Sequence, residues 1–153
     1  MRDKRKLLID QLDRKLLVFS AAMEAEIPER GWIFTIRNTL NMTLEQLGRR
    51  LNISRQGVKR IENSEMSGSI TINLLREAGH AMDMKLVYGF VPRHGTVSKM
   101  IERKSYELAK KIIHRTDQTM LLEDQATDQE HLKVAVEDLA DQIRQEVRRS
   151  LWD

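Results

Sequence analysis

Apolar residues recur at steps of three and four along most of this chain, which is the spacing of helices with one buried face. The clearest case is residues 42–63, where two short apolar stripes are separated by a polar turn. The first stripe is Leu44, Leu47 and Leu51, and the second is Val58 and Ile61. The pattern therefore predicts two short amphipathic helices joined by a tight turn.

Polar residues at the ends of the two stripes support these boundaries. Thr43 stands at the N-cap position of the first helix, and Gln46 follows three residues later, as in a capping box. Asn52 lies in the turn, where its tolerance of the left-handed conformation is useful, and Ser54 is placed to cap the second helix. Gly48 costs about 1 kcal/mol relative to Ala inside a helix, which suggests close packing at that point.

The same spacing predicts five further helices, at residues 3–26, 32–41, 71–82, 96–122 and 129–151. The first has the stripe Leu7, Leu8, Leu12, Leu16 and Phe19, and Pro28 ends it. We expect this stripe to pack on the core, with a dimer contact as the alternative. In the second helix we expect Trp32, Ile33, Ile36 and Leu40 to face the core, with Trp32 as an anchor.

Residues 85–91, K-L-V-Y-G-F-V, change to a period near two and are rich in β-branched and aromatic residues. This pattern predicts a short β-strand that ends at Pro92. A single strand needs a partner, and the same strand of a second copy would form a dimer ribbon. The alternative is a loop whose aromatic residues pack onto the N-terminal helix.

The last two helices are expected to form an antiparallel hairpin. The stripe of the final helix is nearly heptad and consists of Leu132, Val136, Leu139, Ile143, Val147 and Leu151. This stripe either adds to the core or forms a dimer or partner surface. The fold class that follows is mainly α, with a helix-turn-helix domain, one short β-strand and a C-terminal helical hairpin.

We accordingly divide the chain into four parts. These are an N-terminal helix at 1–28, a helix-turn-helix domain at 29–83, the strand at 84–92 and the hairpin at 93–153.

Composition and charge narrow the function. The 153 residues include no cysteine, which excludes disulfides and thiolate metal sites and fits a reducing cytoplasm. No apolar run approaches the roughly 18–20 residues of a membrane span, and the N-terminal segment is too acidic for a secretory signal. We expect a soluble cytoplasmic protein with no membrane contact.

The Lys and Arg residues are unevenly distributed. Residues 1–95 contain 16 Lys and Arg against 11 Asp and Glu, whereas residues 96–153 contain 10 against 12. A basic surface is what the neutralisation of DNA phosphates requires, so the N-terminal part is the better candidate for DNA binding.

No residue pattern indicates an enzyme. The four histidines are scattered, and the sequence has no H-E-x-x-H motif and no phosphate-binding glycine loop. We expect no catalytic residue, no metal site and no cofactor.

The second of the two short helices has the composition of a DNA recognition helix. Its outward residues Arg55, Gln56 and Lys59 are candidates for reading base edges, because Arg pairs bidentately with guanine and Gln with adenine. Gly57 would leave room for close approach to the groove. The candidates for phosphate contacts are Arg37, Thr43, Ser54, Arg60 and Asn63.

Residues 43–63 resemble the lambda-repressor-like, or XRE, helix-turn-helix family. The resemblance rests on T-L-E-Q-L-G-R-R-L followed by N-I-S-R-Q-G-V-K-R-I-E-N. It implies that the recognition helix begins near Ser54. It also implies that the target is double-stranded DNA, with a palindromic operator that a homodimer binds.

A wider resemblance is to the mobile mystery protein A family. It rests on R-G-W-I-F-T-I-R-N-T-L-N-M-T, S-I-T-I-N-L-L-R-E-A, L-V-Y-G-F-V-P, H-R-T-D-Q-T-M-L-L-E-D-Q and the final L-W-D. The family is understood as XRE-type regulators encoded beside a Fic-domain protein. The resemblance implies a repressor of its own operon, and an antitoxin of a Fic-type toxin module. The alternative function is an antitoxin that acts mainly by direct contact with its partner enzyme.

Overall fold

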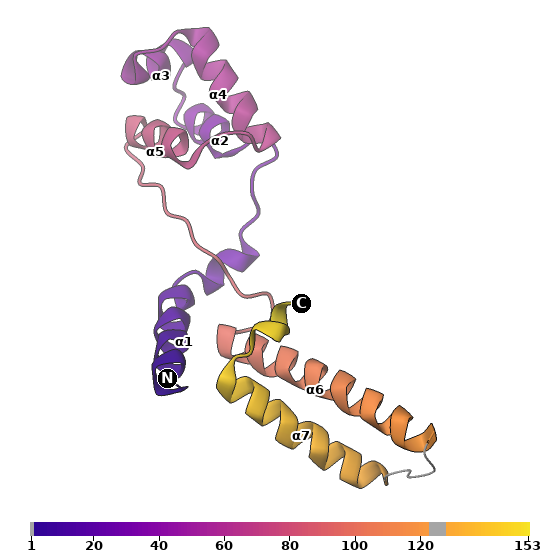
Figure 1. The fold of residues 1–153 in the computed structure, drawn as a ribbon. Helices are drawn as coiled ribbons and strands as arrows, with labels where there is room; N and C mark the ends of the chain where they lie inside the picture. Colours follow the sequence, from indigo (N-terminus) through magenta and orange to yellow (C-terminus); the bar gives the residue numbers. More distant parts are fainter. Residues whose placement is uncertain (1, 123–127) are drawn as a thin grey trace. The chain divides into compact units, whose positions relative to one another are not determined.

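The computed structural model of this chain describes residues 2–122 and 128–153 (Figure 1). It divides into two compact units: a central unit of residues 24–89, and a terminal unit that joins residues 1–23 to residues 90–153. The N-terminal helix therefore belongs with the C-terminal hairpin, although the whole central unit separates them in sequence. Within the described ranges, no helix is both long and apolar enough to cross a membrane.

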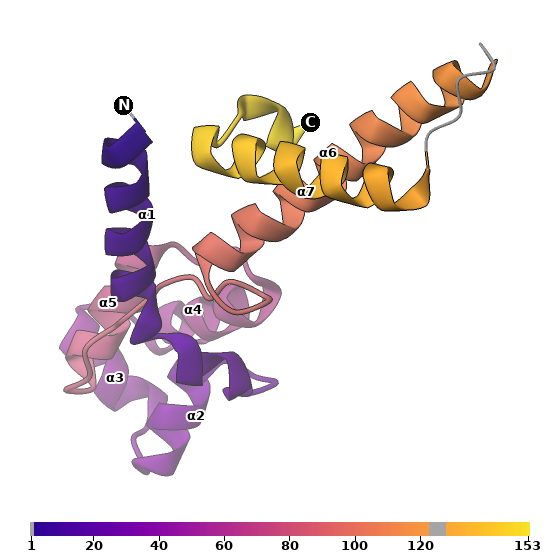
Figure 2. The same ribbon diagram turned by 90° about the horizontal axis from the view of Figure 1, so that it is seen from below.

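The central unit consists of four short helices around one core. They are α2 (Trp32–Thr39), α3 (Leu44–Leu51), α4 (Arg55–Ser67) and α5 (Ile72–Ala81). The views in Figures 1 and 2 show α3 and α4 joined by a short turn, with α2 and α5 beside them. The buried core residues are Ile33, Leu47, Val58, Ala78, Ala81 and Met82.

The helices expected at 32–41 and 71–82 and the two short helices of residues 42–63 are confirmed, as are their caps. The Thr43 hydroxyl accepts a hydrogen bond from the Gln46 backbone N–H, and the Gln46 side chain accepts one from the Thr43 N–H. Thr71 caps α5 with a single bond, because its hydroxyl accepts a hydrogen bond from the Leu74 backbone N–H. The recognition helix α4 extends four residues beyond the Asn63 expected from the sequence and ends at Gly68, which has a positive φ of 82°.

The expected role of Trp32 is wrong. Its side chain is 45% exposed and Leu40 is 51% exposed, whereas Ile33 is buried. The reason is that α2 has only eight residues and buries one narrow face, which contains Ile33 and Arg37. Periodicity placed the apolar residues on a broader face than the neighbouring helices cover.

The terminal unit contains α1 (Arg2–Leu17), the short 3₁₀ helix η1 (Ser20–Glu24) at its edge, α6 (Val97–Leu122), α7 (Gln129–Glu146) and η2 (Arg149–Trp152). The expected antiparallel hairpin of α6 and α7 is confirmed (Figure 1). Asp128 occupies the N-cap position of α7, although its side chain makes no capping hydrogen bond. The part of the connecting segment at 123–127 lies outside the described residues.

The near-heptad stripe of the final helix forms the core of the terminal unit. Val136, Ile143 and Leu151 are buried, and Leu139 and Val147 pack against them. These side chains are therefore used within the chain, which agrees with a stripe that adds to the core, and a dimer or partner contact of the hairpin stays a prediction.

The N-terminal helix differs from expectation in length and in orientation. The continuous helix expected at 3–26 is broken after Leu17. Leu7, Leu8 and Leu12 are 56%, 48% and 43% exposed, while Ile9 packs against the core of the hairpin. Most of the leucine stripe therefore faces outward.

Asp13 joins α1 to the beginning of α6. Its carboxylate accepts hydrogen bonds from the backbone N–H groups of Val97 and Ser98, at 2.7 and 3.2 Å, and from the Ser98 hydroxyl at 2.7 Å. Thr96 serves the next two N–H groups, of Lys99 through its hydroxyl and of Met100 through its carbonyl. The N–H groups of the first three helical residues, which have no acceptor within the helix, are thus all satisfied.

The expected β-strand is wrong. Within the part of the chain that the structure describes, residues 85–91 are irregular and make no backbone–backbone hydrogen bond. The physical reason is that strand pairing needs a second extended segment, and the other described elements are helices. Nor do the aromatic residues pack on α1, because Tyr88 and Phe90 are 63% and 82% exposed.

Candidate nucleic-acid interface

The start of α4 is built to present its first residues to solvent. Ser54 has extended backbone angles, and its hydroxyl accepts a hydrogen bond from the Gly57 N–H at 3.1 Å. Arg55 and Gln56, directly after this cap, are both exposed. A helix N-terminus also carries a partial positive charge, which favours an approaching phosphate.

The two sides of α4 have different roles. Val58 and Glu62 are buried against the rest of the unit. Gln56, Lys59, Arg60 and Asn63 are exposed, and their spacing of three, four and seven residues puts them on one face. Arg55 lies at the edge of this face, one turn before Lys59. The structure therefore brings five of the expected DNA-contacting residues together on one polar surface, which we call the recognition face.

Arg37 is not on the recognition face. Its side chain is only 10% exposed, and its Nε donates to the Glu62 carboxylate at 2.5 Å. Its Nη1 also donates to the Met42 carbonyl at 2.8 Å. This buried ion pair gives Arg37 a structural role in place of the phosphate contact expected from the sequence: it fixes α4 against α2 and the start of α3.

A second carboxylate of α4 holds the start of α2. Glu65 accepts hydrogen bonds from the backbone N–H groups of Trp32 and Ile33, at 2.7 and 2.9 Å. The sequence analysis missed both Glu62 and Glu65. The signal was present, since acidic residues at the inner positions of an otherwise amphipathic helix need buried partners.

The turn before α4 is held by close backbone packing. Asn52 adopts the left-handed conformation that its sequence position suggested, with φ of 55° and ψ of 38°. A Cβ at Gly48 would lie 2.7 Å from the Ile53 carbonyl oxygen, so only glycine fits there without movement. The close packing of this turn therefore fixes the orientation of α4 relative to α3.

Gly57 has a partner inside the chain. A Cβ at this position would lie 3.2 Å from the Cβ of Ile53, and Gly57 is half-buried. The packing of the turn therefore requires a small residue here. This explains the glycine without the close approach to the DNA groove that the sequence suggested.

Arg55 has a neighbour that sequence reasoning did not find. Its guanidinium lies 3.3 Å from the carboxylate of Glu45 on α3, and both side chains are more than half exposed. The pair spans the turn, where helical spacing predicts nothing about contact. Glu45 thus holds one of the two main base-reading candidates in the unbound protein.

Thr43 and Ser54, two of the expected phosphate contacts, have exposed hydroxyls that accept hydrogen bonds as helix caps. A capping hydroxyl keeps its own hydrogen free to donate, for example to a phosphate oxygen. The two residues lie at the starts of α3 and α4, where backbone N–H groups also point outward.

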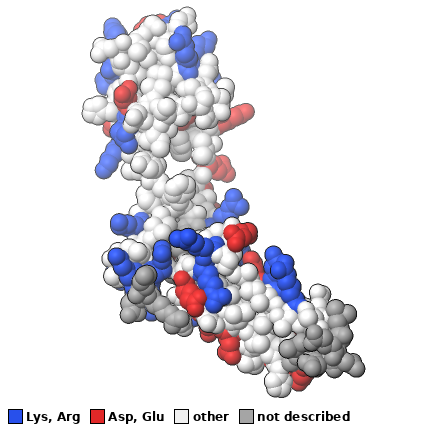
Figure 3. Space-filling model, viewed as in Figure 1, with Lys and Arg blue, Asp and Glu red and all other residues white. Residues whose placement is uncertain are grey.

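The charge of the central unit is modest. Residues 33–88 contain eight Lys and Arg against five Asp and Glu, and Figure 3 shows basic and acidic side chains interspersed on one face of this unit. Much of the basic excess of the first 95 residues is in α1, outside this unit. The recognition face is therefore a local basic surface rather than part of a uniformly positive domain.

The comparisons with known proteins agree with this geometry. A family model described as Helix-turn-helix matches residues 33–88, which include α2 to α5 and the turn. No curated protein matches the chain, and no solved structure matches it either. The central unit of this chain is an XRE-like helix-turn-helix domain, the type found in DNA-binding transcription regulators.

Proposed function

We propose that this protein is a sequence-specific DNA-binding repressor of its own operon. The observation that carries the proposal is the recognition face of α4. There, Arg55 and Gln56 follow an N-cap at the exposed start of the helix, and Lys59, Arg60 and Asn63 continue along the same side. In this arrangement Arg55, Gln56 and Lys59 read base edges in the major groove, and Arg60 and Asn63 bind phosphates.

The division of roles is tested with alanine variants on two duplexes, one from upstream of the gene and one of scrambled sequence. Arg55→Ala and Gln56→Ala should each reduce the preference for the upstream duplex about 5- to 100-fold, as expected for one lost base contact. Arg60→Ala should weaken binding to both duplexes and lower the salt dependence by about one counterion.

The matched control is Arg103→Ala, which removes an exposed arginine of α6 in the terminal unit. It should leave both affinities unchanged. If Arg55→Ala and Gln56→Ala change the two affinities by the same factor, α4 binds DNA without reading its sequence and the proposal fails.

The proposal includes a homodimer, since one recognition helix reads only half of a palindromic operator. The exposed leucines of α1, Leu7, Leu8 and Leu12, support it. They form an apolar helix face that the chain itself leaves uncovered. A two-fold pairing of this face would bury it in both copies.

Sedimentation of the full-length protein tests the dimer. The wild-type chain should sediment at twice its mass of 17.9 kDa at micromolar concentration. Leu8→Glu should give monomers, whereas Val134→Glu, at a 56% exposed position of α7, should not. A wild-type monomer, or a dimer that Leu8→Glu leaves intact, would contradict this interface.

A second candidate function is that of an antitoxin which restrains a Fic-domain enzyme by direct contact, as the family resemblance implies. Val87, Tyr88 and Phe90 favour it, because these large apolar side chains are 63–82% exposed. Large exposed apolar side chains in one segment are typical of protein contacts. We propose no catalytic step, metal or cofactor for this chain.

Phe90→Ser distinguishes the two functions. If the segment binds the enzyme, this variant should lose co-purification with a co-expressed Fic-domain protein and keep its binding to upstream DNA. Val134→Ser is the control for loss of an exposed apolar side chain. Failure of the wild-type chain to co-purify would remove this second function and leave the repressor proposal standing.

A further inference from the structure

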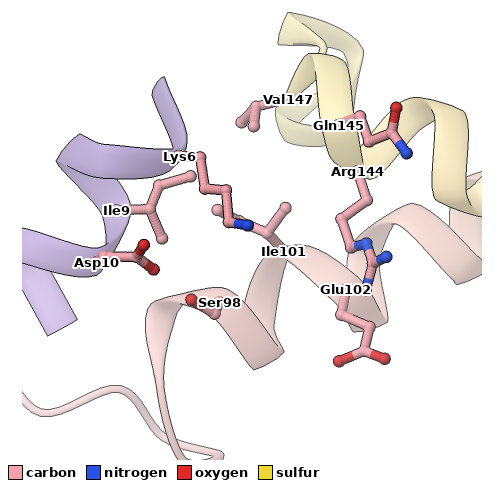
Figure 4. Close-up of a pocket in the computed structure, with 9 residues that line it drawn as sticks. All are labelled: Lys6, Ile9, Asp10, Ser98, Ile101, Glu102, Arg144, Gln145 and Val147. Atoms are coloured by element: carbon pink, nitrogen blue, oxygen red, sulfur yellow. The ribbon is translucent and has the colours of Figure 1, made fainter. Parts of the chain in front are cut away.

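The terminal unit contains a pocket of about 500 Å³ between α1, α6 and α7 (Figure 4). This volume is within the range of about 300–1,000 Å³ that small-molecule sites occupy. Its lining residues come from α1 and from the two helices of the C-terminal hairpin. Neither the recognition face nor the exposed leucines of α1 contribute to it.

One part of the pocket wall is apolar. Ile9 of α1, Ile101 of α6 and Val147 at the end of α7 line it, and Ile101 is only 4% exposed. These three side chains also pack in or against the core of the terminal unit, which fixes their positions.

Four charged side chains surround this apolar part, and their two positive and two negative charges balance. Lys6 and Asp10 project from α1, Glu102 from α6 and Arg144 from α7 (Figure 4). Among the described residues, Lys6, Asp10 and Glu102 form no ion pair, so their charges are available. Arg144 is 3.1 Å from Asp141, but a guanidinium has five N–H donors and can bind a second carboxylate.

The backbone at the pocket is also unusual. Val147 has a φ of 46° and a ψ of 61°, in the left-handed region where β-branched residues are rare. A residue in this region is strained, and strained residues gather at binding sites. Here the conformation ends α7 and turns the Val147 side chain toward the pocket.

We propose that this pocket binds a small zwitterion with an apolar body, of the class of free amino acids and dipeptides. The carboxylate of the ligand pairs with Arg144 and Lys6, its ammonium group pairs with Asp10, and its side chains contact Ile9, Ile101 and Val147. A ligand of a single charge sign would meet two like charges on the wall. A purely apolar ligand would leave four charged groups poorly solvated.

The test is calorimetric titration of the full-length protein with the dipeptide Leu-Leu. Two capped forms serve as comparisons: N-acetyl-Leu-Leu lacks the ammonium group, and Leu-Leu amide lacks the carboxylate. The uncapped dipeptide should bind, and each cap should weaken binding at least about tenfold, because it removes a charge-assisted hydrogen bond. Absence of binding at millimolar dipeptide, or equal binding of all three peptides, overturns the proposal.

Variants locate the site. Arg144→Gln should weaken Leu-Leu binding about tenfold or more and leave the weaker binding of Leu-Leu amide, which has no carboxylate, unchanged. Asp10→Asn should also weaken Leu-Leu binding about tenfold or more, and should leave the weaker binding of N-acetyl-Leu-Leu, which has no ammonium group, unchanged. Arg103→Gln, on α6 outside the pocket, is the control. If Arg144→Gln fails to fold, Lys6→Gln on the exposed side of α1 replaces it. If none of the pocket variants weakens Leu-Leu binding, the peptide binds elsewhere and the inference is contradicted.

Discussion

Individual residues of the helix-turn-helix domain are constrained by a few close neighbours. Gly48, the Arg37–Glu62 pair and Glu65 each hold one helix against another, and none of them belongs to the recognition face. Stability and DNA contact are thus assigned to different residues, so they can be altered separately.

Gly48→Ala should destabilise the domain by about 1–3 kcal/mol, because the new Cβ would lie 2.7 Å from a backbone oxygen that has little freedom to move. Gly79→Ala is the matched control. Its Cβ would meet the Met84 carbonyl oxygen at an ordinary 3.5 Å, so the better helix propensity of Ala should leave stability equal or up to about 1 kcal/mol higher. Urea unfolding of both variants measures the difference, and equal effects would refute the packing role of Gly48.

Glu62→Gln should destabilise the protein by about 3 kcal/mol, because it leaves the Arg37 charge buried without its partner. The double variant Arg37→Met with Glu62→Leu should recover most of that loss, since it removes both charges. Chemical unfolding gives the stabilities, and DNA titrations of the folded variants test the role of Arg37. If Arg37→Met is as stable as wild type but binds DNA several-fold more weakly, Arg37 contacts phosphate after all.

At the scale of the elements, most helices could be predicted because each has an apolar stripe and a recognisable cap. Thr43, Asn52, Ser54 and Thr71 all occupy the positions their chemistry favours. What periodicity could not show is how much of a stripe has a neighbour. Trp32 and Leu8 continue their stripes and are nevertheless exposed, because none of the other described elements covers them.

Helical periodicity predicted the recognition face as well as the helix α4 that contains it. Residues at the outer positions of α4 are polar and basic, and helical spacing alone places them together. The ion pair of Arg55 with Glu45 and the burial of Arg37 depend on the crossing of separate helices. Neither contact has a periodic signature. For residues 85–91 the pattern was that of a strand, but strand formation depends on a pairing partner that local pattern does not supply.

Glu45 on α3 lies beside the proposed DNA-reading residue Arg55 of α4. Its carboxylate pairs with Arg55 and is itself repelled by phosphates. Glu45→Gln should therefore strengthen binding to scrambled DNA by up to about fivefold, given that an exposed pair is worth about 0–1 kcal/mol. The measurement is a fluorescence anisotropy titration at low salt.

Asp83→Asn is the control for Glu45→Gln. It removes one negative charge from the same domain and breaks an exposed pair with Arg50 instead, at a positive φ that Asn tolerates. Equal strengthening by both variants would mean that only net charge matters and that the Glu45–Arg55 pair has no specific effect.

The contact of α1 with α6 depends on the charge of Asp13. Burial raises the pKa of this carboxyl, but the hydrogen bonds from Ser98 and Val97 lower it by more, so it lies below its ordinary value. A carboxyl with a depressed pKa stabilises the folded state at neutral pH, and that stability is lost only as the pH falls through the depressed value.

Asp13→Ala should lower the stability of the protein by about 1 kcal/mol at pH 7, as for a lost helix cap. The difference from wild type should shrink as the pH falls through the depressed pKa of Asp13, because the carboxyl is then protonated in the folded state as well as in the unfolded state. Thermal unfolding across this pH range measures it, with the exposed Asp138→Ala as control. A difference that is the same at pH 7 and pH 3 would show that the carboxylate charge is not involved.

At the scale of the whole molecule, the two units contain different candidate binding surfaces. The central unit presents the recognition face, while the terminal unit contains the exposed leucines of α1 and the charged pocket. Because the central unit has only a small excess of basic residues, affinity for random DNA should be weak at physiological salt. Under the proposed function, useful binding would then depend on base contacts and on two copies acting together.

The most direct test of this account is a titration of the purified protein on the DNA immediately upstream of its gene, against a scrambled duplex, at two salt concentrations. The account predicts a preference of about a hundredfold or more for the upstream duplex, with a two-fold symmetric footprint, and a preference that persists at the higher salt. Equal binding to both duplexes that declines steeply with salt would contradict sequence-specific repression by the recognition face of α4.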